Sequence, residues 1–124
     1  MKGHRILIVE DEFLVALEIA SVLADAGFEV LEPAGTIEGA LRAIGSEAID
    51  GVILDCNLSG RDVTEIADSL TARHIPFVFL TGYGRESLPP TFRDLPLISK
   101  PFDEKHLVAS VRAMLLRSGL PASS

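Results

Sequence analysis

The sequence predicts a doubly wound α/β domain, in which a five-stranded parallel sheet is covered by helices on both faces. Three observations predict this fold: short apolar runs, helical periodicity between them, and polar residues gathered where the runs end. Strands that alternate with helices imply right-handed crossover connections and therefore a parallel sheet. A chain of 124 residues has room for one hydrophobic core, so residues 1–124 are interpreted as one domain.

Five short segments have the composition of buried strands. Helices that cover both faces of a parallel sheet remove the alternation of polar and apolar residues, which leaves nearly continuous apolar runs. The fifth segment is the weakest, because it offers only two apolar residues in a row. The expected strands are residues 6–9, 28–31, 52–54, 77–80 and 97–98.

Between these strands, apolar residues recur with the spacing of one helix face, i, i+3, i+4 and i+7. Gly27 closes the first helix, since glycine suits a left-handed C-terminal cap. The last helix begins with acidic and ends with basic residues, as the helix dipole favours. The core is therefore expected at about residues 4–117, followed by a short tail at 118–124. The expected helices span residues 13–26, 37–44, 63–70 and 103–117.

Composition argues against several classes of protein. The formal net charge of −7 disfavours a nucleic-acid partner, because that affinity depends on clustered lysines and arginines. Membrane insertion is not expected, since the longest apolar run, residues 13–17, has five residues and a span needs about 20. No cleavable signal pattern precedes the first strand, so a cytoplasmic location is expected. The one cysteine, Cys56, is interpreted as a buried side chain.

The polar residues of chemical interest all follow expected strands. Glu10 and Asp11 follow the first, Asp55 the third, Thr81 the fourth, and Lys100 the fifth. Ligands of such folds bind at the carboxyl ends of the strands. Carboxylates crowded together resist ionising unless a cation joins them, and ligands that are all oxygens favour Mg²⁺ over zinc. An acidic helix start explains Glu10 and Asp11 equally well, but Asp55 would otherwise be an isolated charge beside the core.

The same residues indicate phosphoryl chemistry. The Asp55 carboxylate is able to attack a phosphoryl group whose charge a metal ion neutralises. Lys100 supplies a second positive charge, and the Thr81 hydroxyl can donate to a phosphoryl oxygen. Taken alone, Lys100 also fits a solvated surface lysine, so the combination carries the hypothesis.

This ordered set resembles the receiver domain of bacterial response regulators, the phosphoacceptor of two-component phosphorelays. The resemblance covers essentially the whole chain and implies the flavodoxin-like strand order 2-1-3-4-5. It implies that Asp55 is the phosphoacceptor, that Thr81 and Lys100 contact the phosphoryl group, and that the Lys100–Pro101 bond is cis. The set consists of Glu10, Asp11, Asp55, Thr81, Lys100, Pro101 and Phe102.

The resemblance also implies a metal site. Asp11 and Asp55 would bind Mg²⁺ directly, together with the backbone carbonyl of Asn57. Glu10 would act through water. Gly60 matches the loop that follows the phosphoacceptor, where it tolerates a turn that other residues resist.

Two departures from the family concern the switch that follows phosphorylation. Leu97 stands where receivers usually carry an aromatic residue, three positions before the lysine. Glycines and prolines between residues 81 and 100 predict a shortened or irregular fourth helix, with residues 84–94 loosely held and part of the partner-binding face. Residues 79–84 resemble the subgroup of stand-alone regulators with a Phe-Ala-Thr-Gly-X-Tyr signature. The switch is therefore expected to involve Tyr83, Leu97 and Pro101.

The expected function is that of a stand-alone signalling domain, not an enzyme. It would accept a phosphoryl group from a sensor histidine kinase or a phosphotransfer protein and signal by protein–protein interaction. An aspartyl-phosphate hydrolase of a related fold is one alternative, but it needs an acid-base residue where Asn57 stands. A pseudo-receiver scaffold is another, although such proteins usually lose part of the acidic set. A nicotinamide-binding domain would need a Gly-rich fingerprint after the first strand.

Overall fold

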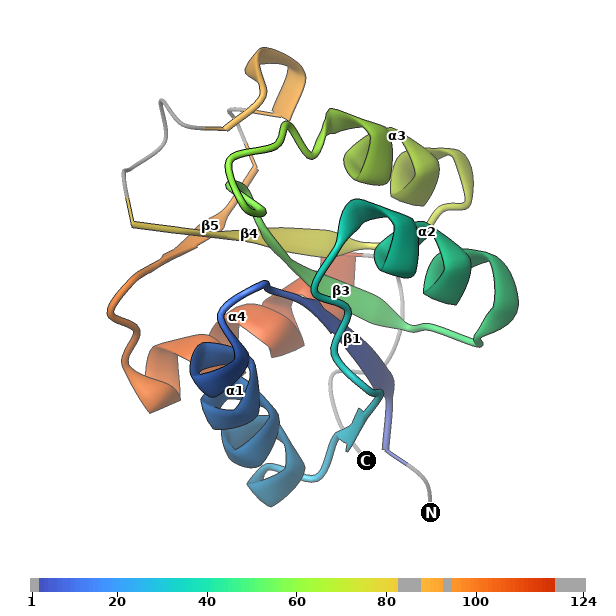
Figure 1. Ribbon diagram of the computed structural model, residues 1–124. Helices are drawn as coiled ribbons and strands as arrows, with labels where there is room; N and C mark the ends of the chain where they lie inside the picture. The colour runs from blue at the N-terminus through green and yellow to red at the C-terminus, as the bar shows by residue number, and fades with distance from the viewer. Residues whose placement is uncertain (1–2, 83–87, 93–94, 118–124) are drawn as a thin grey trace.

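The computed structural model describes residues 3–82, 88–92 and 95–117. Its centre is a parallel sheet with strand order β2-β1-β3-β4-β5 (Figure 1), which confirms the predicted fold. The second strand is shorter than predicted, because Phe28 packs into the core and is not paired in the sheet. The strands are β1 (Arg5–Val9), β2 (Glu29–Val30), β3 (Gly51–Asp55), β4 (Phe77–Thr81) and β5 (Leu97–Ser99).

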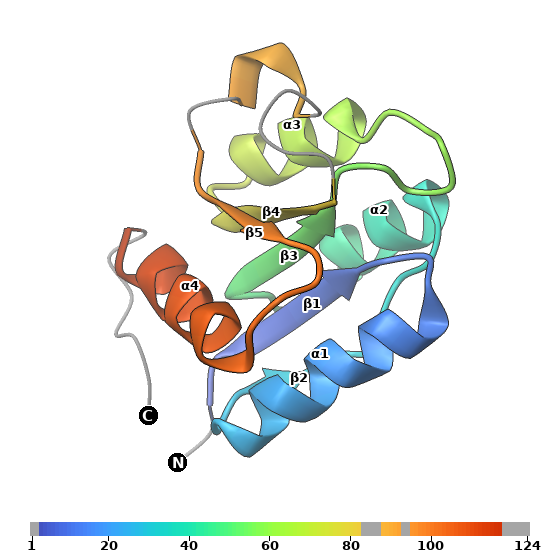
Figure 2. The same cartoon turned by 90° about the vertical axis from the view of Figure 1, so that its left-hand side faces the viewer.

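Two helices cover each face of the sheet. Figure 2 shows α1 and α4 on one side and α2 and α3 on the other. The periodic segments of the sequence therefore form the helices for which they were predicted, with ends that differ by a few residues. The helices are α1 (Phe13–Asp25), α2 (Ile37–Ser46), α3 (Thr64–Ala72) and α4 (Glu104–Arg117). In the described ranges, no helix has the length and apolar character needed to cross a membrane.

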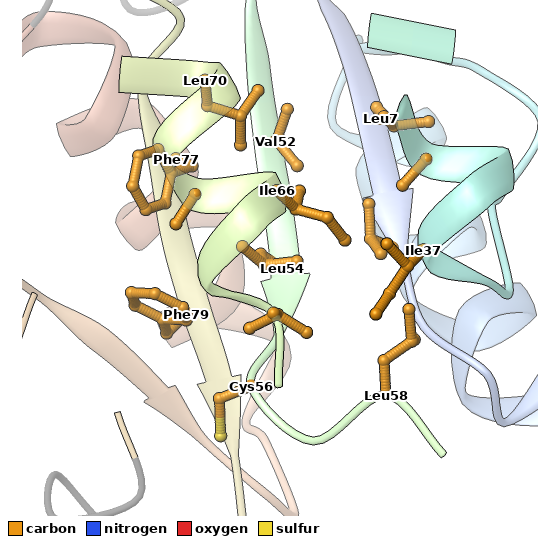
Figure 3. Packing of buried hydrophobic residues seen from close by; sticks show 14 of the residues in the cluster. Leu7, Ile37, Val52, Leu54, Cys56, Leu58, Ile66, Leu70, Phe77 and Phe79 are labelled. Carbon is orange, nitrogen blue, oxygen red and sulfur yellow. The ribbon is translucent and has the colours of Figure 1, made fainter. Parts of the chain in front are cut away.

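The core has two halves, because successive residues of a strand point to opposite faces of the sheet. In β1, Leu7 and Val9 pack toward α2 and α3, whereas Ile6 and Ile8 pack toward α1 and α4. Figure 3 shows the first half, with Phe79 among its labelled side chains. Both faces of the central strands are therefore shielded from solvent, which is why their sequence is uniformly apolar.

The connection from β4 to β5 contains one described helical turn, the 3-10 helix η2 (Pro90–Phe92). This agrees with the prediction of a short or irregular helix. The Phe92 ring lies 5.7 Å from that of Phe77 and 6.1 Å from that of Phe79, and Leu88 is buried in the same core half. These contacts pack the described part of the connection against the sheet, and the expectation that residues 84–94 are loosely held stays a prediction. Tyr83 lies outside the described residues.

Thr36 caps the N-terminus of α2, where its Oγ1 accepts a hydrogen bond from the Gly39 amide at 2.9 Å. Replacing Thr36 by alanine should lower the free energy of unfolding by about 1 kcal/mol, because the amide loses its partner. Urea denaturation of the variant measures this change. Ser21→Ala removes an exposed hydroxyl from the middle of α1 and serves as the control, for which no comparable loss is expected. An equal loss in both variants would contradict the capping role.

Candidate functional site

The sequence-predicted site residues meet at the carboxyl edge of the sheet. The parallel register sets Val9 beside Leu54, Asp55 beside Leu80, and Thr81 beside Ser99, so the strands end at one level. A cleft of about 400 Å³ opens there. It is lined by Asp11, Glu12, Asp55, Cys56, Asn57, Ser59, Gly60, Thr81, Gly82 and Lys100.

Three carboxylates converge at this cleft, and two of them, Asp11 and Asp55, line it. Glu10, Asp11 and Asp55 each offer an oxygen, and these oxygens lie within 4.8 Å of one another. Glu10 and Asp55 are buried and Asp11 is partly buried. A donor set made only of carboxylate oxygens fits a hard divalent cation such as Mg²⁺. The residues present therefore fit the metal that the sequence predicted.

Glu10 is the most deeply buried of the three carboxylates. Burial and the neighbouring Asp55 raise its pKa from 4.5 to about 7, although the Glu12 amide and Lys100 act in the opposite direction. The Glu12 amide donates to Glu10 Oε1 at 3.0 Å, and Lys100 Nζ lies 3.0 Å from Glu10 Oε2. Glu10 thus gives up its proton less readily than an ordinary glutamate, which limits the anionic charge that the cleft must accommodate.

The pKa of Asp11 is shifted in the opposite direction to that of Glu10. Partial burial raises its pKa, but hydrogen bonds, first among them that from Ser59, outweigh this effect and leave the pKa below its ordinary value. The Ser59 hydroxyl donates to Asp11 Oδ2 at 2.8 Å. Ser59 reaches it from a turn in which Ser59 and Gly60 both have positive φ angles, 54° and 77°. Asp11 is therefore kept ionised at the mouth of the cleft.

Asp55 is 3% exposed and ends the fully buried strand β3. Its Oδ1 accepts a hydrogen bond from the Asn57 amide at 3.0 Å, and its Oδ2 lies 3.5 Å from Lys100 Nζ. The chain turns immediately after Asp55, so the carboxylate is held from its own loop and faces the cleft. A buried carboxylate oriented in this way is suited to act as a nucleophile.

Among the described residues of the cleft lining, Lys100 is the cation. Its Nζ pairs with Glu10 at 3.0 Å, Glu12 at 3.2 Å and Asp55 at 3.5 Å. Burial lowers its pKa, but these carboxylates, led by Glu10, outweigh burial and hold the pKa above its ordinary value. The Lys100 amide donates to the Thr81 carbonyl at 2.8 Å, and the Lys100–Pro101 peptide bond is cis, as predicted. The ammonium is therefore charged, and the backbone of Lys100 is fixed against the edge of β4.

Two further predicted residues, Thr81 and Leu97, lie in different places, one in the cleft lining and the other against the core. Thr81 ends β4, is 1% exposed and lines the cleft. Leu97 packs against the core half beneath α2 and α3 and is not part of the cleft lining. Cys56 is buried, as expected for this lone thiol.

No role was predicted for two residues of the site, Glu12 and Ser59. Each touches a predicted residue across a long stretch of chain, Glu12 contacting Lys100 and Ser59 contacting Asp11. Glu12 is the third acidic residue after β1, and this run of acids was the only sign in the sequence that it belongs to the site. Ser59 carried no signal in the sequence beyond its place beside Gly60.

Solved structures resemble this chain along nearly its whole length. The solution structure of SdrG from Sphingomonas melonis is 41% identical, with a TM-score of 0.80, and the match covers 91% of this chain and 96% of SdrG. The crystal structure of a putative response regulator from Chloroflexus aurantiacus is 30% identical, with a TM-score of 0.80. That match covers 94% of this chain and 100% of the other.

Curated relatives are longer. The phosphate regulon transcriptional regulatory protein PhoB of Pseudomonas aeruginosa is 36% identical over 127 residues, which cover 96% of this chain and 55% of PhoB. The transcriptional regulatory protein PdtaR of Mycobacterium tuberculosis is 29% identical over 118 residues, which cover 92% of this chain and 58% of PdtaR. This chain thus spans little more than half the length of these relatives. Residues 6–112 match the model of the response regulator receiver domain. The chain therefore belongs to the response regulator receiver domain family.

Proposed function

We propose that Asp55 accepts a phosphoryl group in a Mg²⁺-dependent reaction and that the domain then signals through contacts with another protein. One observation carries the proposal: a buried nucleophilic carboxylate, two further carboxylates and a charged lysine share one strand-end cleft. Family membership supports it, since phosphorylation of an aspartate is the general function of receiver domains. We further propose one domain over residues 1–124 with its core at about 4–117.

Asp11 and Asp55 are the proposed direct ligands of Mg²⁺, with the Asn57 carbonyl, while Glu10 acts through water. When bound, the ion would neutralise charge on the phosphoryl oxygens. Asp11 suits direct contact, because it is partly exposed and its lowered pKa keeps it ionised. Glu10 suits a more distant role, since it is buried and already engaged by Lys100 and the Glu12 amide.

In the proposed reaction, an Asp55 carboxylate oxygen attacks the phosphorus of a phosphohistidine. The new O–P bond forms as the P–N bond breaks, and the bonding pair returns to the imidazole nitrogen, which takes up a proton. The product on this chain is an acyl phosphate. The Lys100 ammonium faces the incoming negative charge, and the buried Thr81 hydroxyl lies at the cleft to donate to a phosphoryl oxygen.

A sensor histidine kinase or a phosphotransfer protein is the proposed phosphodonor. Phe13 and Leu14 begin α1 directly after the acidic run and are 70% and 78% exposed, and Leu17 is 45% exposed one turn further. A second cleft beside Lys100 is lined in part by Val15 and Phe102. Exposed apolar side chains that border a reaction site favour a protein partner with an apolar surface of its own.

The proposal treats the chain as a phosphoacceptor and not as a hydrolytic enzyme. Asn57 occupies the position two residues after Asp55, and its amide side chain cannot exchange a proton as a general acid or base. A pseudo-receiver role is disfavoured by the complete acidic set. A cytoplasmic location is part of the proposal, since a chain with one cysteine has no internal disulfide of the kind that extracellular proteins often carry.

The test uses acetyl phosphate and intact-mass spectrometry. With Mg²⁺, the protein should gain one phosphoryl group, and borohydride reduction should convert the labelled residue, Asp55, to homoserine. Excess EDTA should reduce labelling to background, because the crowded carboxylates would then repel the donor. Transfer from a panel of purified histidine kinases would next identify the donor. Undiminished labelling in EDTA, or homoserine at another position, would refute the assignment.

A further inference from the structure

Glu12 occupies an unusual place for an exposed carboxylate. It is the N-cap residue of α1, yet its side chain accepts no capping hydrogen bond. Its backbone amide is bound to Glu10 Oε1, and its side chain, 64% exposed, reaches Lys100 with Oε1 3.2 Å from Nζ. Glutamate is not among the residues whose side chains ordinarily cap the N-terminus of a helix. Here it binds the cation of the phosphoryl site instead.

Lys100 is shared unequally among its partners. Its Nζ is nearer to Glu10 and Glu12, at 3.0 and 3.2 Å, than to Asp55, at 3.5 Å. An ammonium group has three N–H donors, so these three carboxylates engage all of them, and an incoming phosphoryl oxygen must compete for one. Glu10 is buried and fixed, whereas Glu12 borders solvent and can release the lysine at little cost.

We propose that Glu12 is a positioning residue that restrains phosphorylation by drawing the Lys100 ammonium away from Asp55. The inference rests on the proposed function and adds to it a residue outside the predicted acidic set. An incoming phosphoryl group brings further negative charge, which Lys100 must meet. Glu12 competes for the lysine and repels the donor, and both effects slow the reaction.

The test compares phosphorylation rates by acetyl phosphate in excess Mg²⁺. Glu12→Gln keeps the shape of the side chain but removes its charge, and it should react about two- to fivefold faster, the effect expected from a partly exposed ion pair. Glu18→Gln is the matched control. Glu18 belongs to α1 and lines the second cleft beside Lys100. Among the described residues, however, the ion pairs of Lys100 are with Glu10, Glu12 and Asp55. The control should react at the wild-type rate.

A second measurement does not depend on reactivity. In metal-free protein, the Cε and Hε NMR signals of Lys100 should shift in Glu12→Gln and stay in place in Glu18→Gln. An unchanged rate, equal acceleration by both variants, or unmoved Lys100 signals would each overturn the inference. Such results would leave the Asp55 assignment intact, which only failed labelling of the wild type would remove.

Discussion

Asp55→Asn should gain no phosphoryl group from acetyl phosphate or from a cognate phosphodonor, while the wild type gains one. The amide keeps the shape of the side chain, and its oxygen can still accept the hydrogen bond that the Asn57 amide gives to Asp55 Oδ1. It lacks the negative charge of the nucleophile, so the loss should be complete and not partial. Intact-mass measurement of both proteins after identical treatment checks this result.

The control for this variant is Asp68→Asn, which changes an exposed aspartate on α3. It should be labelled as fully as the wild type. Asp55→Asn should also be at least as stable as the wild type without metal, because it removes a carboxylate that crowds Glu10. Labelling of Asp55→Asn at the wild-type level would show that the phosphoacceptor is another residue.

The fold could be predicted because its signals are local. Strands β3 and β4 are buried along their whole length, and this leaves an apolar run that no surface strand would show. The edge strand β2 was predicted too long, since Phe28 is apolar for a different reason: it fills the core without pairing. Apolar composition records burial, and it does not distinguish a strand residue from a neighbour that is merely buried.

The candidate site could be predicted only in part. The rule that parallel strands end at one edge brings Asp55, Thr81 and Lys100 together without any knowledge of side chains. The ion pair between Glu12 and Lys100 joins residues 88 positions apart and depends on how each side chain leaves the backbone. The Ser59 contact with Asp11 depends on two positive φ angles in one turn. Neither contact can be predicted from residue types or from their spacing in the sequence.

The switch, too, could be predicted only in part from the sequence. Leu97 indicated that the coupling differs from that of most receivers, and the structure sets Leu97 beside Phe79 in the sheet register. The aromatic contact on this side of the sheet comes instead from Phe92, whose ring packs on Phe77 and Phe79. An apolar residue in a segment rich in proline gives no sign of where it will dock. The role of Pro101 in the switch stays a prediction, and Tyr83 lies outside the described residues.

The second large effect is a dependence of stability on pH that originates at Glu10. Its pKa is about 7 in the folded protein and 4.5 ordinarily, so the folded state holds a proton that the unfolded state releases between these values. The unfolded state thus binds fewer protons in this window, and stability falls as pH rises through it. A difference of this size corresponds to about 3 kcal/mol. Urea denaturation of metal-free protein at pH 5 and pH 8 should reveal a loss approaching that value.

The other charged groups of the site do not share this window. Lys100 has a raised pKa and stays charged throughout, and Asp11, whose pKa is lowered, changes stability only as pH falls below about 4. Glu10→Gln mimics the protonated carboxyl and should flatten the profile, whereas Glu65→Gln, an exposed change on α3, should preserve it. Mg²⁺ should restore stability at pH 8 more than at pH 5, since a cation relieves the repulsion that ionised Glu10 creates. A wild-type profile as flat as that of Glu10→Gln would mean that Glu10 is already ionised at pH 5, with Lys100 as its sufficient partner.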